Sequence, residues 1–210
     1  MKIEQEYRFA LTAEEYDRLR MSLGEPLHLH RQRNHYFDTT AEDLCRRGFG
    51  LRLREQEGRY RLAWKGPDQA TAEEASVGIS RRREEEHEIP TQEARTMLEE
   101  GAVLGQLEAD LVSNGFRMPA EIESLRGDRV RTIGWVETER ATYALSGEAC
   151  LELDRVRFSD GRIDHELEVE WSGGDGLSLG QRLRAWLTGL GIEARPQPET
   201  KLARFFRYRA

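Results

Sequence analysis

The chain has 210 residues and a mass of 24.3 kDa, which fits one large domain or two very small ones. Its 32 basic and 39 acidic residues give a net charge of −7, which argues against a general nucleic-acid coat because such a coat needs a basic surface. The mean hydropathy is −0.75, and no apolar run approaches the roughly 18 residues of a membrane span, so we expect no membrane association.

The cysteines and the N-terminal residues bear on the compartment. Cys45 and Cys150 are the only cysteines, and they lack the Cys-x-x-Cys spacing of a zinc site. The first residues contain no apolar segment of the kind that a secretory signal requires. We therefore expect a reducing compartment, most simply the cytoplasm.

The first half of the chain predicts strands interrupted by helices. Residues 3–9 alternate in the manner of a strand, and Thr12 with Glu15 forms a capping box that begins a helix. This helix ends at the Gly24-Glu25-Pro26 segment. The patterns that follow predict strands at 27–38, 50–55, 59–65 and 80–89, and helices at 90–100 and 104–114.

The second half of the chain also predicts strands together with helices. We expect strands at 128–139, 140–146, 149–158 and 163–171. Ser178 with Gln181 predicts a capping box for a helix that presents leucines at 179, 183, 187 and 190 on one face, and a short helix is expected near 199–206. About eight strands ordered as meanders predict an antiparallel α+β protein with enough strands to close a barrel. No repeat or linker is found, so one domain over residues 1–210 is the simplest organisation.

Several predicted strands carry charge of mostly one sign on their polar face. Like charges that are neighbours on a strand repel each other, so such faces are easier to explain if opposite charge lies between them. Carboxylates at period two can bind a hard divalent cation, and arginine side chains bind phosphate oxygens in pairs. For any strand taken alone, an exposed face is the simpler interpretation. The residues concerned are Glu4 and Glu6, Arg52 and Arg54, Arg61 and Lys65, Glu152 and Asp154, and Glu166, Glu168 and Glu170.

The segment Glu4-Gln5-Glu6-Tyr7-Arg8 resembles the ExExK signature that opens the CYTH domains, also called triphosphate tunnel metalloenzymes. The resemblance covers essentially the whole chain. Further segments are similar to those of the family and follow in its order: Asn34 to Thr39, Gly50 to Arg54, Trp64 to Pro67, Glu139-Arg140, Leu153-Asp154, Glu166 to Glu170 and Thr200 to Arg204.

This resemblance implies an eight-stranded antiparallel β-barrel whose charged faces point inward and whose apolar faces are covered by helices. It implies that a triphosphate is bound inside through its charge. By position, the phosphate contacts would come from Arg8, Arg52, Arg54, Lys65, Arg140 and Lys201. The ligands of one or two Mg²⁺ or Mn²⁺ ions would be Glu4, Glu6, Asp154, Glu168 and Glu170.

Two departures from the family pattern affect the expected chemistry. Arg8 stands where the signature most often has lysine, and arginine does not give up its proton. We therefore expect metal-activated water with a carboxylate as proton acceptor, and a catalytic set of Glu4, Glu6, Arg8, Glu168 and Glu170. The segment Arg81 to Glu88 allows several strand registers, and we take Arg83 as its phosphate contact.

The expected reaction is metal-dependent hydrolysis of a small-molecule triphosphate to diphosphate and phosphate. Inorganic tripolyphosphate is the first choice of substrate and thiamine triphosphate the next, because the motifs describe a phosphate site and no base pocket. The alternatives are an adenylyl cyclase of class IV type, which would make cyclic AMP and pyrophosphate from ATP, an RNA 5′-triphosphatase, and a non-catalytic polyphosphate- or nucleotide-binding module. We expect no nucleic-acid partner, and the sequence leaves monomer and homodimer open.

Overall fold

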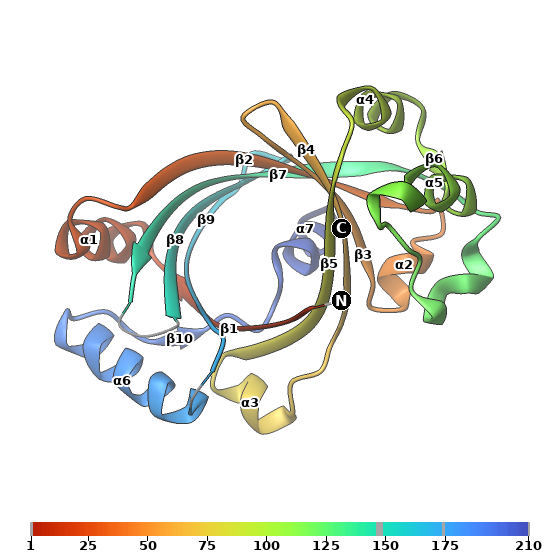
Figure 1. The fold of residues 1–210 in the computed structure, drawn as a ribbon. Coiled ribbons are helices and arrows are strands. Elements are labelled where there is room, and N and C mark those ends of the chain that lie inside the picture. The colour runs from red at the N-terminus through yellow and green to blue at the C-terminus, as the bar shows by residue number, and fades with distance from the viewer. Residues whose placement is uncertain (1, 146–148, 174, 210) are drawn as a thin grey trace. The chain divides into compact units, whose positions relative to one another are not determined.

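The computed structural model describes residues 2–145, 149–173 and 175–209. Figure 1 labels the α-helices and strands in these ranges. The strands are β1 (Lys2–Leu11), β2 (His28–Asp38), β3 (Gly50–Gln56), β4 (Arg59–Asp68), β5 (Ile79–Ile89), β6 (Ala102–Val103), β7 (Arg129–Ala144), β8 (Ala149–Phe158), β9 (Ile163–Trp171) and β10 (Arg195–Pro196). The α-helices are α1 (Ala13–Leu23), α2 (Asp43–Arg46), α3 (Ala72–Ser76), α4 (Thr91–Glu100), α5 (Leu104–Leu111), α6 (Gly176–Gly189) and α7 (Lys201–Arg209), and two 3₁₀-helices are η1 (Val112–Asn114) and η2 (Ala120–Leu125).

The predicted elements are confirmed with two corrections. The strands expected at 128–139 and 140–146 form the single strand β7, because residues 135–145 around the expected boundary include no glycine or proline to turn the chain. Residue 146 lies outside the described ranges. The capping box expected at Ser178 and Gln181 is wrong. Helix α6 begins at Gly176, and the side chain of Asp175 accepts the hydrogen bond from the backbone N of Leu177 at 3.0 Å.

The strand order defines the fold class. In the described part of the chain the hydrogen-bonded order is β10-β1-β5-β4-β3-β2-β7-β8-β9, and β1 also pairs with β9. Apart from the two-residue β10, this order of eight strands returns to its start. The protein is therefore an α+β protein with a closed eight-stranded antiparallel β-barrel, as predicted.

The chain divides into two compact units. Unit 1 contains Gln32–Asp68 and Arg82–Val136 with the first residues of β1, and unit 2 contains Glu4–Arg31, Gln69–Arg81 and the described part of Glu137–Ala210. The single domain expected over residues 1–210 stays a prediction.

The apolar core of unit 1 lies between strands and helices. Leu51 and Leu53 of β3 and Leu62 and Trp64 of β4 are almost completely buried. They belong to the same cluster as Met97 of α4 and three leucines of α5, Leu104, Leu107 and Leu111. Because successive side chains of a strand point to opposite faces, Arg52, Arg54, Arg61 and Lys65 lie on the other face of β3 and β4.

The apolar core of unit 2 is built in the same way. Tyr7 and Phe9 of β1 pack in one buried cluster with apolar residues of β8 and β9 and with helices α1 and α6. Leu179, Leu183 and Leu187 of α6 belong to this cluster, which confirms the predicted apolar face of that helix. None of the helices in the described ranges combines the length and the apolar character needed to span a bilayer.

One close contact in this core gives a stability test. A Cβ at Gly180 of α6 would overlap the hydroxyl of Tyr7, which donates a hydrogen bond to the carbonyl oxygen of Gly176 at 2.7 Å. We predict that Gly180→Ala lowers the free energy of unfolding by about 1 to 3 kcal/mol through overpacking. At Gly189, in the same helix, a Cβ would meet no atom within 4 Å, so Gly189→Ala should be neutral or stabilising. Urea unfolding measures both, and equal effects would contradict this packing.

Candidate functional site

Unit 2 contains a buried cluster of carboxylates and cations on the charged face of its strands. Its position follows from the antiparallel register, which places Arg8 opposite Glu168 between β1 and β9, and Glu152 opposite Glu168 between β8 and β9. Side chains directly opposite each other are close neighbours on one face of a sheet. The cluster comprises Glu4, Glu6, Arg8, Arg140, Glu152, Asp154, Glu166, Glu168, Glu170, Lys201 and Arg204.

Arg140 of β7 is the central cation of this cluster. Its Nε donates to Oδ1 of Asp154 at 2.7 Å, and its Nη2 donates to Oδ2 of Asp154 at 2.6 Å and to Oε2 of Glu168 at 2.5 Å. Its Nη1 also forms an ion pair with Glu152. Burial opposes the charged guanidinium, but Asp154, Glu152 and Glu168 favour it more strongly and raise the pKa of Arg140. Arg140 is therefore a permanent positive charge inside the protein.

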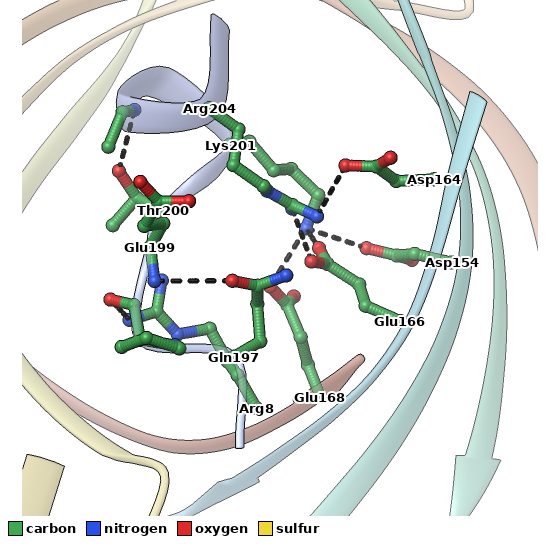
Figure 2. Close-up of polar contacts among 12 residues, drawn as sticks. Arg8, Asp154, Asp164, Glu166, Glu168, Gln197, Glu199, Thr200, Lys201 and Arg204 are labelled. Atoms are coloured by element: carbon green, nitrogen blue, oxygen red, sulfur yellow. Dashed lines mark hydrogen bonds and ion pairs between the residues drawn. The ribbon is translucent and has the colours of Figure 1, made fainter. Parts of the chain in front are cut away.

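Lys201, the first residue of α7, supplies a second buried cation. Figure 2 shows its side chain reaching from α7 towards the carboxylates of β8 and β9. Its Nζ lies 2.8 Å from Oε1 of Glu168 and 2.9 Å from Oδ2 of Asp154, and it also pairs with Glu166. Burial lowers the pKa of Lys201, whereas Glu166, Glu168 and Asp154 raise it by more, so the ammonium stays protonated.

Glu168 is the carboxylate that links these two cations. Burial alone would raise the pKa of Glu168, but Lys201 and Arg140 hold it well below its usual range. Arg8, on the opposite strand, is buried, and its Nη2 donates to the carbonyl oxygen of Pro198 at 3.2 Å. Glu168 is therefore anionic and fixed in place.

Two groups of three carboxylates in unit 2 have the spacing of a metal site. One oxygen from each of Glu4, Glu6 and Glu170 lies within 4.8 Å of the others, and the same holds for Asp154, Glu166 and Glu168. Carboxylate oxygens are the ligands that Mg²⁺ and Mn²⁺ prefer, so the donor chemistry of both groups fits these ions. The structure thus brings together all five predicted metal ligands in unit 2, but divides them between two groups.

The two groups differ in their electrostatic balance. Asp154, Glu166 and Glu168 are paired with Arg140, Lys201 and Arg204. In contrast, burial together with the negative charges of Glu152, Glu4 and Glu6 raises the pKa of Glu170 to about 8. Arg8 lies 3.6 Å from Glu6, but the charges that act most strongly on Glu170 are negative, and a bound divalent cation would relieve this repulsion. The group of Glu4, Glu6 and Glu170, which we call the acidic triad, is the better-fitting metal site.

Unit 1 contains a charged cluster of its own. Nη2 of Arg52 donates to Oε1 of Glu84 at 2.6 Å and to Oε2 of Glu86 at 3.1 Å. Nζ of Lys65 lies 2.9 Å from Oε2 of Glu84, and Nη1 of Arg54 lies 3.6 Å from Oε2 of Glu86. Three of the predicted phosphate contacts are thus neighbours, held by two carboxylates that sequence reasoning did not select.

Arg83 is not placed with this cluster. The β4–β5 register sets Lys65 opposite Glu84 and Ala63 opposite Glu86. Because side chains alternate between faces, Arg83 points to the opposite side, where its Nη1 lies 3.3 Å from Oε1 of the exposed Glu121. The register assumed for Arg83 is therefore corrected, and Glu84 takes the neighbouring position on the charged face.

Other residues of the unit 2 cluster were also missed as site residues. Glu152 and Glu166 could have been found, since Glu152 lies two residues before Asp154 and Glu166 lies two residues before Glu168. Residues two apart share one face of a strand. Arg204 carried the weaker signal of lying three residues after Lys201, on the same face of a helix.

Comparison with known proteins identifies the family. The model of the CYTH domain family matches residues 2–206, so the chain belongs to the CYTH domain family. No curated protein matches the chain.

Three solved structures show how widely the fold is shared. A candidate adenylyl cyclase from Hippeastrum, described with a dominant triphosphatase activity, is 23% identical with a TM-score of 0.79, covering 98% of this chain and 96% of its own. A candidate adenylate cyclase from Bacillus halodurans is 24% identical with a TM-score of 0.67, covering 98% and 100%. The triphosphatase of the mimivirus capping enzyme is 10% identical with a TM-score of 0.54, covering 90% and 89%.

The raised pKa of Glu170 predicts a pH dependence of stability in metal-free protein. Its folded value of about 8 lies above the unfolded value near 4.5, so between these values the folded state binds the extra proton. The free energy of unfolding should therefore fall as the pH rises from 4.5 to 8, by at most about 1.4 kcal/mol per pH unit from this group.

Urea unfolding in EDTA at pH 5.5 and 7.5 checks this expectation. The difference in stability between the wild type and Glu170→Gln isolates the group from other titrations. We expect Glu170→Gln to gain stability relative to the wild type as the pH rises, and a difference that does not change with pH would contradict the assignment.

Proposed function

We propose that this CYTH domain protein hydrolyses the terminal phosphoanhydride of a triphosphate, with inorganic tripolyphosphate as the first substrate and thiamine triphosphate as the next. The products would be diphosphate and phosphate. The observation that carries this proposal is that unit 2 combines a carboxylate group fit for a divalent cation with the buried permanent cations Arg140 and Lys201. A binder of anions alone would gain nothing from the acidic triad, whereas metal-assisted phosphoryl transfer requires both kinds of group.

The cations of unit 2 provide the binding of the polyanion. Arginine side chains match phosphate oxygens in pairs, and lysine contributes a compact point charge. Because Asp154 and Glu168 already hold Arg140 and Lys201 in fixed positions, little conformational entropy is lost when phosphate oxygens reach them. Arg8 lies opposite Glu168 and adds a third cation. We assign these three residues to the phosphates.

The acidic triad would hold Mg²⁺ or Mn²⁺, which would neutralise charge on the phosphate oxygens and lower the pKa of water. The proton of the attacking water must go to a carboxylate oxygen, because Arg8, Arg140 and Lys201 remain protonated. Glu4, Glu6 and Glu170 are the carboxylates available for this step. The proposed role of Glu168 is to orient Lys201 and Arg140, which hold it as an anion.

Several predicted contacts stay predictions. These are the phosphate contacts of Arg52, Arg54 and Lys65 in unit 1, and the metal contacts of Asp154 and Glu168, which the unit 2 cations share. A cytoplasmic location and a monomeric or dimeric state are likewise unchanged expectations.

An adenylyl cyclase is the second candidate function, because two structurally similar proteins are described as candidate cyclases. A cyclase would use the same phosphate-binding cations but would direct the ribose hydroxyl of ATP at the α-phosphate and release pyrophosphate. The triphosphatase is favoured because the charged residues account for phosphates and metal alone, and because the Hippeastrum protein is described with a dominant triphosphatase activity.

The products formed from three substrates test this proposal. We predict that tripolyphosphate gives phosphate at a higher rate than ATP in Mg²⁺ or Mn²⁺, with thiamine triphosphate between them, and that EDTA abolishes release. Phosphate and pyrophosphate assays with separation of nucleotides measure the outcome. Cyclic AMP with pyrophosphate from ATP would establish the cyclase instead, and metal-independent binding without turnover would identify a binding module.

A further inference from the structure

Arg204 forms a second clamp on the strand that carries the site. It lies three residues after Lys201 in α7, and its side chain is 1% exposed. Its Nη1 lies 2.8 Å from Oδ2 of Asp164, and its Nη2 donates to Oε2 of Glu166 (Figure 2). Asp164 and Glu166 are two residues apart on β9, so both point to the same face and meet one guanidinium.

Glu166 is shared between two cations of the same helix. Its Oε2 accepts from Arg204, and its Oε1 pairs with Nζ of Lys201. The side chain of Glu166 has no solvent exposure, so its charge has to be balanced by protein groups. Residues three apart share one face of a helix, so Lys201 and Arg204 would repel each other if Glu166 did not lie between them.

The far end of the clamp is also fixed. The hydroxyl of Tyr208, one turn after Arg204, donates to Oδ2 of Asp164 at 3.1 Å. The ring of Tyr208 packs edge-on against Phe158 of β8 with centroids 4.9 Å apart, and Phe158 is 1% exposed. Helix α7 is thus joined to β8 and β9 through Arg204 and Tyr208.

We propose that Arg204 is a positioning residue for Lys201. By balancing much of the charge of Glu166, Arg204 allows Nζ of Lys201 to contact Glu168 and Asp154 as well as Glu166, in a position where phosphate oxygens of the substrate can reach it. The identity of that substrate rests on the proposed function. Glu166 then belongs to this positioning device and not to the metal ligands, although its spacing from Asp154 and Glu168 would allow either.

The proposal predicts a specific failure when Arg204 is neutralised. The full charge of Glu166 would then attract Lys201 and compete with the phosphate oxygens for its ammonium. The affinity for the polyanion should fall even though Lys201 is still present. A merely structural role would lower stability but would leave the contribution of Lys201 to binding unchanged.

A double-mutant cycle tests this coupling. Calorimetry in EDTA measures the binding of tripolyphosphate to the wild type, Arg204→Gln, Lys201→Gln and the double variant, and the KM and kcat of hydrolysis are measured in Mg²⁺. We expect each single variant to lose about 10-fold in affinity, and the double variant to lose no more than about twofold beyond either. The loss should lie mainly in KM, and Arg204→Lys should recover part of it.

Arg207→Gln is the matched control. Arg207 lies on the same helix but is largely exposed. It pairs with Glu199 and contacts Tyr208, but it does not contact Glu166 or Asp164 in the described structure, so its replacement should leave binding within about twofold. An Arg204→Gln variant that binds like the wild type, or a double variant whose losses multiply to about 100-fold, would overturn the positioning role.

Two further measurements keep the proposal testable. If Arg204→Gln does not fold, Asp164→Asn removes one arm of the clamp and should weaken binding several-fold, and unchanged binding would overturn the proposal.

If the wild type neither binds nor hydrolyses tripolyphosphate, the proposed function fails. The coupling is then read from urea unfolding. Lys201→Gln should shift the midpoint more in the Arg204→Gln background, because it then removes the remaining cation that pairs with the buried Glu166, and equal shifts would overturn the positioning role.

Discussion

The balance of buried charge is the constraint on which the rest of unit 2 depends. The antiparallel register of β1, β8 and β9 brings carboxylates opposite one another, and several of them have almost no solvent exposure. Buried carboxylates are tolerated only when they are paired, neutralised or bound to a metal. Arg140 and Lys201 reach the same carboxylates from β7 and α7. The same ion pairs therefore join these elements and set the electrostatics of the site.

This balance divides the carboxylates into two kinds. Those that meet Arg140, Lys201 and Arg204 are compensated within the protein and hold the cations in place. In the acidic triad, Glu6 pairs with Arg8 at 3.6 Å, but burial and the neighbouring carboxylates raise the pKa of Glu170. The proposed function would use both kinds, because oriented cations would bind the phosphates and the acidic triad would bind the metal. The proposed phosphoryl chemistry would therefore depend on electrostatics and would need no nucleotide-binding loop.

Much of the fold and part of the site could be predicted from sequence, because the alternation of apolar and charged residues shows which side chains share a face of a strand. Residues 3–9, 149–158 and 163–171 alternate cleanly, and their charged faces became the unit 2 cluster. The register of neighbouring strands cannot be predicted from this alternation. A slip of one residue moves every side chain to the opposite face of the sheet. Arg83 was misplaced for that reason. Arg204, a partner of Glu166, was missed because it lies on α7, distant in sequence. The start of α6 was misplaced because Asp175 and Ser178 are both suitable N-cap residues, and it is the side chain of Asp175 that accepts the capping hydrogen bond.

Mn²⁺ binding to three proteins tests the central claim most directly. The claim is that the acidic triad holds the metal while the neighbouring group is neutralised by side chains. Titration of wild type, Glu170→Gln and Glu166→Gln with Mn²⁺, followed by electron paramagnetic resonance of the unbound ion, gives the affinity of each. The account predicts that Glu170→Gln loses at least about 10-fold in affinity and that Glu166→Gln stays within about threefold of the wild type. A large loss in Glu166→Gln with an unchanged Glu170→Gln would contradict it.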